Sequence, residues 1–184
     1  SESFALVGVL ANSSDFLIIL SMKFQYDLDS IEVYDDFFEE STRDQIFKYL
    51  QRPKWSLTGG NAMNAFWHMD DLENEEYFSI YLFNKISQKM GDKIKNHSIN
   101  RIYANGQTGG QCGNPHSDDG DYTLLYYPNP KWDIGWQGHL IFVDLDWNPD
   151  KVVAYKPNRM VCFPSNTVHY ADAPTRLFSG LRTS

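Results

Sequence analysis

The sequence predicts a mainly β protein, a jelly roll with supporting helices. Two segments before residue 97 carry apolar residues at helical spacing. From residue 97 onward the apolar residues alternate with polar ones or form short continuous runs, which is the pattern of β-strands. Turn-forming Asn, Gly and Pro residues separate these runs at close intervals. Many short strands after two helices indicate an antiparallel double-sheet jelly roll with helices packed on one face.

Size and charge narrow the class of protein. A chain of 184 residues with 42% hydrophobic and 15% aromatic residues fits one domain with a real core. The net charge of -8 and the lack of a Lys- or Arg-rich cluster make nucleic acid a poor candidate partner. The apolar run at residues 16–20 is too short to span a bilayer and lacks the basic region of a secretory signal, so we expect no membrane association.

Cysteine usage predicts the compartment. Cys112 and Cys162 form no disulfide framework and no C-x-x-C pair, which is typical of a protein of the reducing cytoplasm. We expect Cys162 to be a small buried residue and Cys112 to be a loop residue. The sequence leaves the oligomeric state open.

The N-terminal stretch differs from the rest of the chain. Residues 1–21 are serine-rich with one apolar patch, and from Met22 onward the chain becomes acidic and aromatic. One hypothesis is that residues 1–21 are an extension before a natural start at Met22; the alternative is an ordinary edge strand at residues 16–20. We expect residues 22–184 to form a single domain, since they contain no repeat and no linker.

In the first half of that domain, the sequence predicts a strand at residues 31–34 and two helices. The first helix begins near Ser41 and ends before Pro53. The second runs from about Asn74 to Met90, with acidic residues in its first turn, lysines in its last turn and a glycine after it. Between the helices, residues 55–69 predict a loop or a strand with a turn.

The second half predicts a series of strands separated by turn signals. The expected strands lie at residues 98–104, 116–118, 122–127, 139–144, 151–155, 160–163, 167–170 and 178–183.

A glycine-rich loop at residues 109–113 leads to His116 and Asp118. On a strand these two side chains point the same way, with α-carbons about 7 Å apart at ~3.4 Å per residue. One imidazole and one carboxylate could then bind the same ion. Two histidines and one carboxylate, with the remaining positions open, are the ligands used by non-haem Fe(II) oxygenases. The pattern therefore predicts a third ligand, a histidine further along the chain.

His169 is the best candidate for that ligand. It follows a strand-turn-strand pattern that returns the chain to the sheet, where a jelly roll would bring it opposite His116. We expect His68 and His97 to be surface residues and His139 to be a sheet-edge residue. The local sequence leaves open a structural His169 that binds no metal.

An Fe(II) enzyme of this kind needs an electron-supplying cosubstrate. The usual one, 2-oxoglutarate, carries a distal carboxylate that must be paired where it is buried, and the planar fork of arginine suits it. Arg176 and Arg182 both follow His169. We favour Arg182, which points opposite to Leu181 in the last expected strand, over Arg176 in a loop. The alternative is that both arginines are surface residues.

The run from Arg101 to Ser184 resembles the prolyl 4-hydroxylase-like branch of the 2-oxoglutarate/Fe(II)-dependent dioxygenase superfamily. The matching motifs are His116-Ser117-Asp118, Leu125-Tyr126-Tyr127-Pro128-Asn129, Trp136-Gln137-Gly138-His139-Leu140-Ile141-Phe142, Phe163-Pro164-Ser165-Asn166-Thr167-Val168-His169 and Leu181-Arg182-Thr183-Ser184. Residues 33–38 are more weakly similar to the N-terminal entry of that family. The resemblance covers most of the chain after Met22 and implies a cupin-like double-stranded β-helix.

The resemblance also implies roles for single residues. His116, Asp118 and His169 would be the iron ligands, and Arg182 would anchor the distal carboxylate of 2-oxoglutarate. Tyr127 and Tyr103 would lend hydroxyl groups to that carboxylate; the alternative for both is an aromatic residue of the sheet core. Gln137-Gly138-His139 departs from the family, which commonly has two glycines and an acidic residue there, so contacts to substrate are left open at this point.

The reaction implied is hydroxylation of a substrate C–H bond with release of succinate and CO2. It requires Fe(II), 2-oxoglutarate and O2, with ascorbate as an optional further component. Halogenating relatives lack the carboxylate ligand, so Asp118 favours hydroxylation. The substrate could be a peptidyl-prolyl residue, an amino acid or another small molecule, and Trp132, Trp136 and Trp147 could form a stacking platform for it or pack in the core.

Two other functions stay open at this stage. A non-enzymatic jelly-roll module that binds a metal or a carbohydrate would need neither Arg182 nor 2-oxoglutarate. A nucleic-acid demethylase of the same superfamily is disfavoured by the acidic charge.

Overall fold

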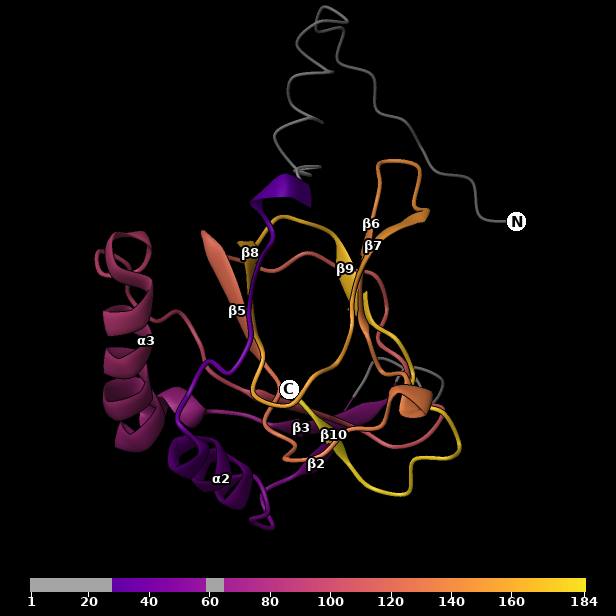
Figure 1. The fold of residues 1–184 in the computed structure, drawn as a ribbon, viewed down its shortest axis with the longest axis horizontal. Coiled ribbons are helices and arrows are strands. Elements are labelled where there is room, and N and C mark those ends of the chain that lie inside the picture. Colours follow the sequence, from indigo (N-terminus) through magenta and orange to yellow (C-terminus); the bar gives the residue numbers. More distant parts are fainter. Residues whose placement is uncertain (1–27, 59–64) are drawn as a thin grey trace, which may run out of the picture.

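The computed structural model describes residues 28–58 and 65–184, and in this part of the chain the strands form three antiparallel sheets (Figure 1). The first sheet has the order β1 (Glu32–Tyr34), β8 (Met160–Pro164), β5 (Tyr122–Tyr126). The second has the order β10 (Arg182–Thr183), β4 (Ala104–Gln107), β3 (Phe66–Met69), β2 (Ser56–Thr58). The third has the order β7 (Pro149–Val153), β6 (Leu140–Val143), β9 (His169–Ala171). The expected extension at residues 1–21 and Met22 lie outside the described residues.

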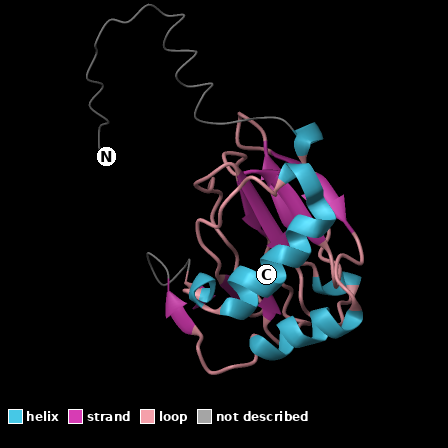
Figure 2. Cartoon of the chain, turned by 90° about the vertical axis from the view of Figure 1, so that its left-hand side faces the viewer, coloured by secondary structure: helices cyan, strands magenta, loops and turns pink. Residues whose placement is uncertain are grey.

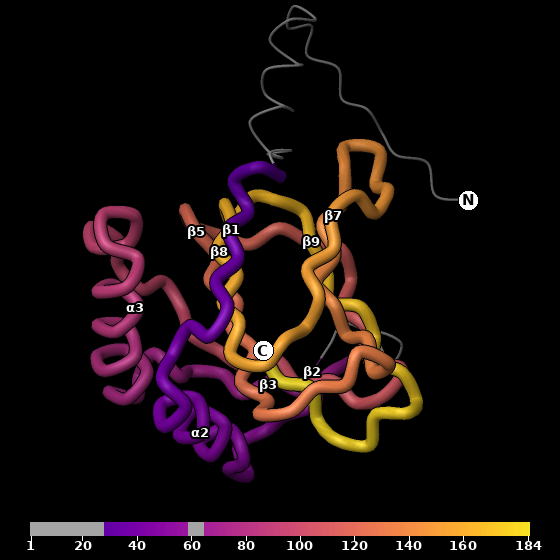
Figure 3. Tube along the Cα trace, in the orientation of Figure 1, coloured from indigo at the N-terminus to yellow at the C-terminus, as the bar shows by residue number. Residues whose placement is uncertain are grey.

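The sheets of β8 and β6 lie on opposite sides of a shared core. Figure 3 shows β1, β5 and β8 on one side and β7 and β9 on the other, with β2 and β3 below. The chain crosses between the sides repeatedly, from β5 to β6 and from β7 to β8 and back to β9. Buried side chains from both sides form one inner cluster, whose members are Ile31, Tyr127, Leu140, Phe142, Val153, Tyr155, Val161 and Phe163.

Alternation along β5 and β8 separates this inner cluster from an outer one. Leu125 packs against the inner cluster, whereas its neighbours Leu124 and Tyr126 pack against the outer cluster. Likewise Val161 belongs to the inner cluster and Met160 to the outer one. Successive residues of a strand face opposite sides, so this sheet is buried on both faces, as its continuous apolar run requires.

The outer cluster is covered by the helices. α2 (Glu40–Tyr49) and α3 (Phe83–Met90) lie outside the sheet of β5 and β8 (Figure 1), and Figure 2 shows them in front of the strands. Apolar residues from both helical segments, including Ile46, Phe78 and Leu82, pack with Met160. The two predicted helical supports on one face are confirmed. The short helical turns are η1 (Leu28–Ser30), η2 (Leu72–Asn74), η4 (Gly91–Lys93) and η5 (Ile134–Trp136).

The second helical segment differs from its predicted bounds. It begins at Tyr77, and its first part, η3 (Tyr77–Leu82), is π-helical before α3 continues it. Glu75 precedes this helix and forms ion pairs with Arg52 (2.7 Å) and Lys54 (2.9 Å), which follow α2. Its carboxylate therefore connects the start of the helix to the segment after α2 and does not lie in a first helical turn.

The predicted strand at residues 116–118 is also wrong in extent. His116 forms a single antiparallel bridge with His169, and Asp118 is in no strand. Pro115 has no backbone N–H to donate to a ladder, and the glycines before it favour a loop. The predicted strand at residues 98–104 is also wrong in extent. Residues 98–103 are irregular, and β4 begins at Ala104. In the part of the chain that the structure describes, no helix is long and apolar enough to cross a membrane.

Candidate metal and cosubstrate site

The bridge between His116 and His169 brings the two histidines together. The N–H of His116 donates to the carbonyl of His169 (3.0 Å), and the N–H of His169 donates to the carbonyl of His116 (2.9 Å). Directly opposed residues of an antiparallel pair project to the same side, so the two rings lie with centroids 4.6 Å apart. Residues far apart in the sequence thus present two imidazoles at one point.

Asp118 completes a three-residue cluster. Its N–H donates to the carbonyl of Ser165 (2.8 Å), which lies in the turn between β8 and β9. Its Oδ1 lies 3.8 Å from Nε2 of His116, and its Oδ2 lies 3.6 Å from Nε2 of His169. One donor atom from each of the three residues lies within 4.8 Å of the others. Donor atoms about 2.1 Å from an octahedral ion are separated by about 3 Å, so a small closure would bring all three onto one cation.

Backbone carbonyls fix the tautomer of both histidines. Nδ1 of His116 lies 2.8 Å from the carbonyl oxygen of Asn114, and Nδ1 of His169 lies 2.9 Å from that of Thr167. A carbonyl oxygen can only accept, so Nδ1 carries the proton in each ring and Nε2 keeps its lone pair. Histidine ligands of metals are usually oriented in this way by a hydrogen bond from the other ring nitrogen.

The charge states also suit a cation. Burial, the largest influence, lowers the pKa of His169, which keeps its imidazole neutral and able to bind a metal at neutral pH. The Thr123 hydroxyl donates to Oδ2 of Asp118 (2.8 Å) and also contacts the Ser165 hydroxyl (3.1 Å). The arrangement is two histidines oriented through Nδ1 and one oriented carboxylate, which is the donor set of an open non-haem iron site.

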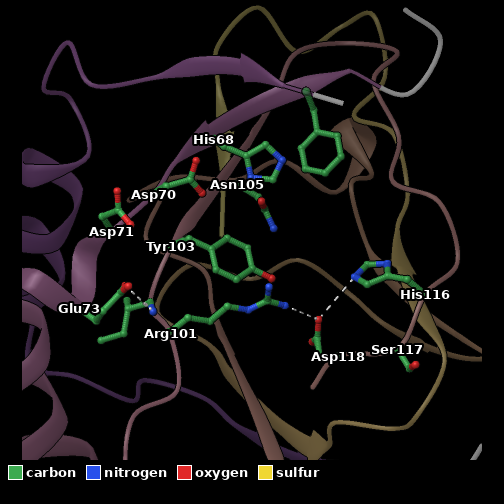
Figure 4. A pocket seen from close by; sticks show the side chains of 12 residues that line it. His68, Asp70, Asp71, Glu73, Arg101, Tyr103, Asn105, His116, Ser117 and Asp118 are labelled. Carbon is green, nitrogen blue, oxygen red and sulfur yellow. Dashed lines mark hydrogen bonds and ion pairs between the residues drawn. The ribbon is translucent and has the colours of Figure 1, made fainter. Parts of the chain in front are cut away.

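The cluster opens into a cleft of about 480 Å³ (Figure 4). Its far wall is formed by residues of β3 and of the segments before and at the start of β4, namely Phe66, His68, Asp70, Asp71, Glu73, Arg101, Ile102, Tyr103 and Asn105. The rings of Phe66 and His68 lie there with centroids 4.6 Å apart and planes tilted by 34°, and the ring of Tyr103 is 6.2 Å from that of His68. His68, predicted as a surface residue, is therefore half-buried in the wall, and burial lowers its pKa.

Arg101 reaches across this cleft toward the cluster. Its guanidinium lies 5.0 Å from the ring centre of Tyr103, and Nη2 lies 3.4 Å from Oδ1 of Asp118 (Figure 4). Its side chain is 51% exposed. Arg101, Phe66 and His68 were not identified as site residues from the sequence, because their proximity to the cluster depends on contacts between segments that are separate in the sequence.

The second part of the site is built around Arg182, which is fully buried. Its Nε donates to the carbonyl of Gly138 (2.9 Å), and its Nη1 donates to Oε1 of Gln107 (2.9 Å) and to the hydroxyl of Ser184 (3.1 Å). Among the described residues, its Nη2 has no hydrogen-bond partner. A buried cation with a free donor is costly unless an anion completes its shell. Arg176, the other candidate, is exposed.

Tyr127 lies beside Arg182. The guanidinium is 5.5 Å from the centre of its ring, and the side chain is fully buried in the inner cluster. Burial raises the pKa of Tyr127 to about 12, an effect that the nearby Arg182 charge opposes but does not cancel. Its hydroxyl also has no hydrogen-bond partner within the described residues. Arg182 lies close enough to lower the pKa of Tyr127 through its side chain, but the geometry of a hydrogen bond between Nη2 and the hydroxyl is not met. A carboxylate beside them would accept from both groups, so the residues present suit the distal end of 2-oxoglutarate.

Tyr103 is placed differently. It lines the open cleft beside Arg101, and burial raises its pKa. The structure brings Tyr127 together with Arg182 and puts Tyr103 on the side of Asp118. The resemblance implies one role for both tyrosines, but they lie at two different positions.

A buried network holds the short strand β10 and thereby Arg182. Oδ1 of Asn129 accepts from the Tyr155 hydroxyl (2.6 Å) and from the N–H (2.9 Å) and hydroxyl (2.8 Å) of Thr183. The side-chain amide of Asn129 donates to the carbonyl of Leu181 (2.9 Å). The residues on both sides of Arg182 are therefore fixed, which orients its side chain inward.

The Gln137-Gly138-His139 segment shapes the same end of the site. Gly138 has φ of 74°, and a Cβ there would lie 3.1 Å from Cδ of Arg182. His139 accepts the N–H of Tyr155 at Nδ1 (3.2 Å), so it supports the inner cluster. Trp132 and Trp136 pack on each other and on Phe178, which favours a packing role for them.

Comparison with known proteins supports the fold. No family model matches the sequence, and no curated protein matches it. Among solved structures, the chain is similar to a prolyl hydroxylase from Trichoplax adhaerens in complex with a peptide fragment of the hypoxia inducible factor oxygen degradation domain (19% identity, 94% of this chain and 90% of that chain, TM-score 0.60). It is also similar to a prolyl-4-hydroxylase from Pseudomonas putida (13% identity, 84% and 89%, TM-score 0.61).

A third similar structure is an oxidoreductase of the 2OG-Fe(II) oxygenase family from Burkholderia pseudomallei (12% identity, 85% of this chain and 83% of that chain, TM-score 0.66). At these identities the likeness concerns the fold. The predicted double-stranded β-helix is confirmed, and this chain has the fold of the 2-oxoglutarate/Fe(II) oxygenases.

Proposed function

We propose that this protein is a 2-oxoglutarate-dependent non-haem Fe(II) dioxygenase that hydroxylates a C–H bond. The observation that carries the proposal is the combination of two half-sites in one fold. His116, Asp118 and His169 converge at an open cleft, and Arg182 lies buried with a free donor beside the unpaired hydroxyl of Tyr127. A metal-binding module needs the first half-site and has no use for the second.

Each residue has a role that follows from its position. His116 and His169 would bind Fe(II) through Nε2, and Asp118 would bind it through a carboxylate oxygen and offset one of its charges. Arg182 and Tyr127 would hold the distal carboxylate of 2-oxoglutarate by charge-assisted hydrogen bonds. Bound together, Fe(II), 2-oxoglutarate and O2 supply an oxidation that converts substrate C–H to C–OH and releases succinate and CO2.

The surroundings of the site separate the buried chemistry from solvent. Phe163 packs on the His169 ring at 4.7 Å, and Phe142 lies at 6.1 Å. Both are fully buried members of the inner cluster. These rings cover one side of His169, and the cleft beside His116 and Asp118 offers the substrate a route to the metal.

The same cleft supports a proposal on the substrate. The Trichoplax structure contains a peptide, and a cleft of about 480 Å³ has room for a peptide segment or a small molecule. The aromatic wall of His68 and Tyr103 offers a flat surface for a ring, and Asp70, Asp71 and Glu73 make its outer part acidic. We therefore propose a neutral or basic peptide or small-molecule substrate, with peptidyl proline as the first class to test.

The test is turnover of the cosubstrate by purified protein. With Fe(II), 2-oxoglutarate and O2, with and without ascorbate, we expect succinate to form, faster when a proline-containing peptide is hydroxylated. The matched control is His169→Ala, which we expect to form none. Metal binding without any 2-oxoglutarate binding or succinate would contradict the proposal and favour the non-enzymatic metal- or carbohydrate-binding module.

A further inference from the structure

Gln107 links the two halves of the site. It is the last residue of β4, is 1% exposed, and lies directly opposite Arg182 in the pairing of β4 with β10. Its Oε1 accepts from Nη1 of Arg182 (2.9 Å), and its Nε2 donates to the carbonyl of Gln111 (2.9 Å). A guanidinium only donates and a carbonyl only accepts, so neither bond survives a flip of the amide.

The loop on the other side of Gln107 is the one that delivers His116. Gly110 donates to the carbonyl of Pro174 (2.8 Å), and Gly113 donates to that of Ala171 (3.0 Å). The bridge between His116 and His169 continues this pairing. Residues 109–116 therefore run beside residues 169–175, and the position of the loop sets the position of the His116 ring.

The loop has a local support that is independent of Arg182. Oε1 of Gln111 accepts from the N–H (2.7 Å) and hydroxyl (2.9 Å) of Thr108, and its Nε2 donates to the carbonyl of Ala65 (3.1 Å). These bonds use the side chain of Gln111, whereas Gln107 binds its backbone carbonyl. The two supports can thus be removed separately.

We propose that Gln107 is a positioning residue that transmits binding of 2-oxoglutarate at Arg182 to the glycine-rich loop and so to the metal ligand His116. The inference rests on the proposed function for the identity of the anion. Nε and Nη1 of Arg182 are already bonded to Gly138, Gln107 and Ser184, so a carboxylate that pairs with the free Nη2 adds a charge-assisted bond that further restrains the guanidinium. The fixed guanidinium holds Oε1 of Gln107 and keeps its Nε2 aimed at Gln111.

The coupling must act in both directions. If 2-oxoglutarate stabilises the loop through Gln107, a loop held in place by other contacts must bind 2-oxoglutarate more tightly by the same factor. Loss of Gln107 should therefore free the loop, weaken 2-oxoglutarate binding and abolish the coupling, whereas loss of the Gln111 side chain should loosen the loop and leave its response to 2-oxoglutarate in place.

Hydrogen exchange of the loop amides tests the coupling without turnover. We would load the full chain with Fe(II) without oxygen, add 2-oxoglutarate to saturation, and follow peptides that cover residues 108–116 by mass spectrometry. In the wild type we expect exchange to slow by about 2- to 10-fold, the range for one neutral hydrogen bond. Gln107→Leu should lose this response at saturating 2-oxoglutarate. Gln111→Leu, the matched control, should exchange faster at the start and keep the response.

Gln107→Glu provides a second variant if Gln107→Leu does not fold. Its carboxylate can still accept from Arg182 but cannot donate to Gln111, so we expect the same loss of response. A normal response in either folded Gln107 variant would overturn the coupling, as would a wild-type loop that ignores bound 2-oxoglutarate. Failure of the wild type to bind 2-oxoglutarate at all, measured by titration calorimetry, would instead refute the proposed function.

Discussion

Two arginines lie in the two halves of the proposed site, and they differ in burial and in hydrogen bonding. Arg182 is fully buried, with its Nε and Nη1 fixed by Gly138 and Gln107. Arg101 has a side chain that is 51% exposed, lies over the Tyr103 ring at 5.0 Å and makes a long contact of 3.4 Å with Asp118. A buried, pre-oriented guanidinium binds an anion strongly because solvent cannot compete, whereas an exposed pair contributes about 0–1 kcal/mol.

This difference indicates that the two halves of the site have separate roles. The Arg182 end is buried and held by several hydrogen bonds, which suits the proposed anchor of a cosubstrate carboxylate. The Arg101 end is open and can rearrange when a metal or a substrate arrives. Variants at each end should therefore change different quantities.

The largest effect is expected from a metal ligand where the two ends meet. His169→Ala removes a buried imidazole whose Nε2 lies 3.6 Å from Asp118. We expect metal affinity to fall by more than the ~10- to 100-fold typical of groups that only orient a ligand. Equilibrium dialysis with Fe(II) or Co(II) measures it. His97→Ala is the control, and equal metal binding by both variants would remove His169 from the site.

The next largest effect is expected on 2-oxoglutarate affinity, from a variant beside Arg182. In Gly138→Ala the added Cβ would lie 3.1 Å from Cδ and 3.2 Å from Nε of Arg182, and the backbone has φ of 74°. We expect 2-oxoglutarate affinity to fall about 10-fold or more, and stability to fall by roughly 1–2 kcal/mol from the left-handed backbone. Gly91→Ala is matched, since φ is 55° and a Cβ there meets nothing within 4 Å.

Thermal unfolding and 2-oxoglutarate titration separate the two contributions in that pair. Gly91→Ala should lose stability and keep its affinity. If both variants lost stability and neither lost affinity, the close approach of Gly138 to Arg182 would have no part in cosubstrate binding.

A smaller effect is expected at Thr123, which orients the carboxylate ligand. Thr123→Val keeps the shape and removes the 2.8 Å bond to Oδ2 of Asp118. We expect metal affinity to fall about 10-fold, the lower end of the cost of losing such a partner. The affinity for 2-oxoglutarate at saturating metal should stay unchanged, and a loss there without a loss of metal affinity would contradict the assignment.

The smallest effect, of opposite sign, is expected at the open end. Arg101→Gln removes a positive charge that competes with a cation for Asp118, so metal affinity should rise, by up to about 5-fold, as for an exposed ion pair. The gain should shrink at high salt, because exposed charges are screened. Weaker metal binding in Arg101→Gln would show that the guanidinium supports the ligand set.

The sequence allowed the ligands to be predicted because each lies in a short motif and the motifs come in a fixed order. His116, Asp118 and His169 converge as expected, but by a different local structure. A cross-strand bridge to His169 and a bond from Asp118 to Ser165 replace the expected strand, and these partners are remote in the sequence.

The parts of the site that could not be predicted all depend on contacts between distant segments. Gln107 gains its role from lying opposite Arg182, and His68 enters the cleft because β3 pairs with β4. Their own neighbours in the sequence carry no signal of this. Strand alternation and the loop position of Arg176 both favour Arg182 as the anchor. Arg182 is fully buried and Arg176 is exposed, although the strand that contains Arg182 is limited to Arg182–Thr183, and its role as an anchor stays a prediction.

The central claim is that Arg182 anchors 2-oxoglutarate behind a metal held by His116, Asp118 and His169. Anaerobic titration of 2-oxoglutarate into the Fe(II)-loaded protein, followed by the visible absorption that develops when both bind, tests it most directly. We predict a saturable band in the wild type, the same band in Arg176→Ala, and at least a ~30-fold weaker affinity in Arg182→Met, as for the loss of one partner of a buried charge pair. Equal affinities in Arg182→Met and the wild type, or a loss confined to Arg176→Ala, would contradict it.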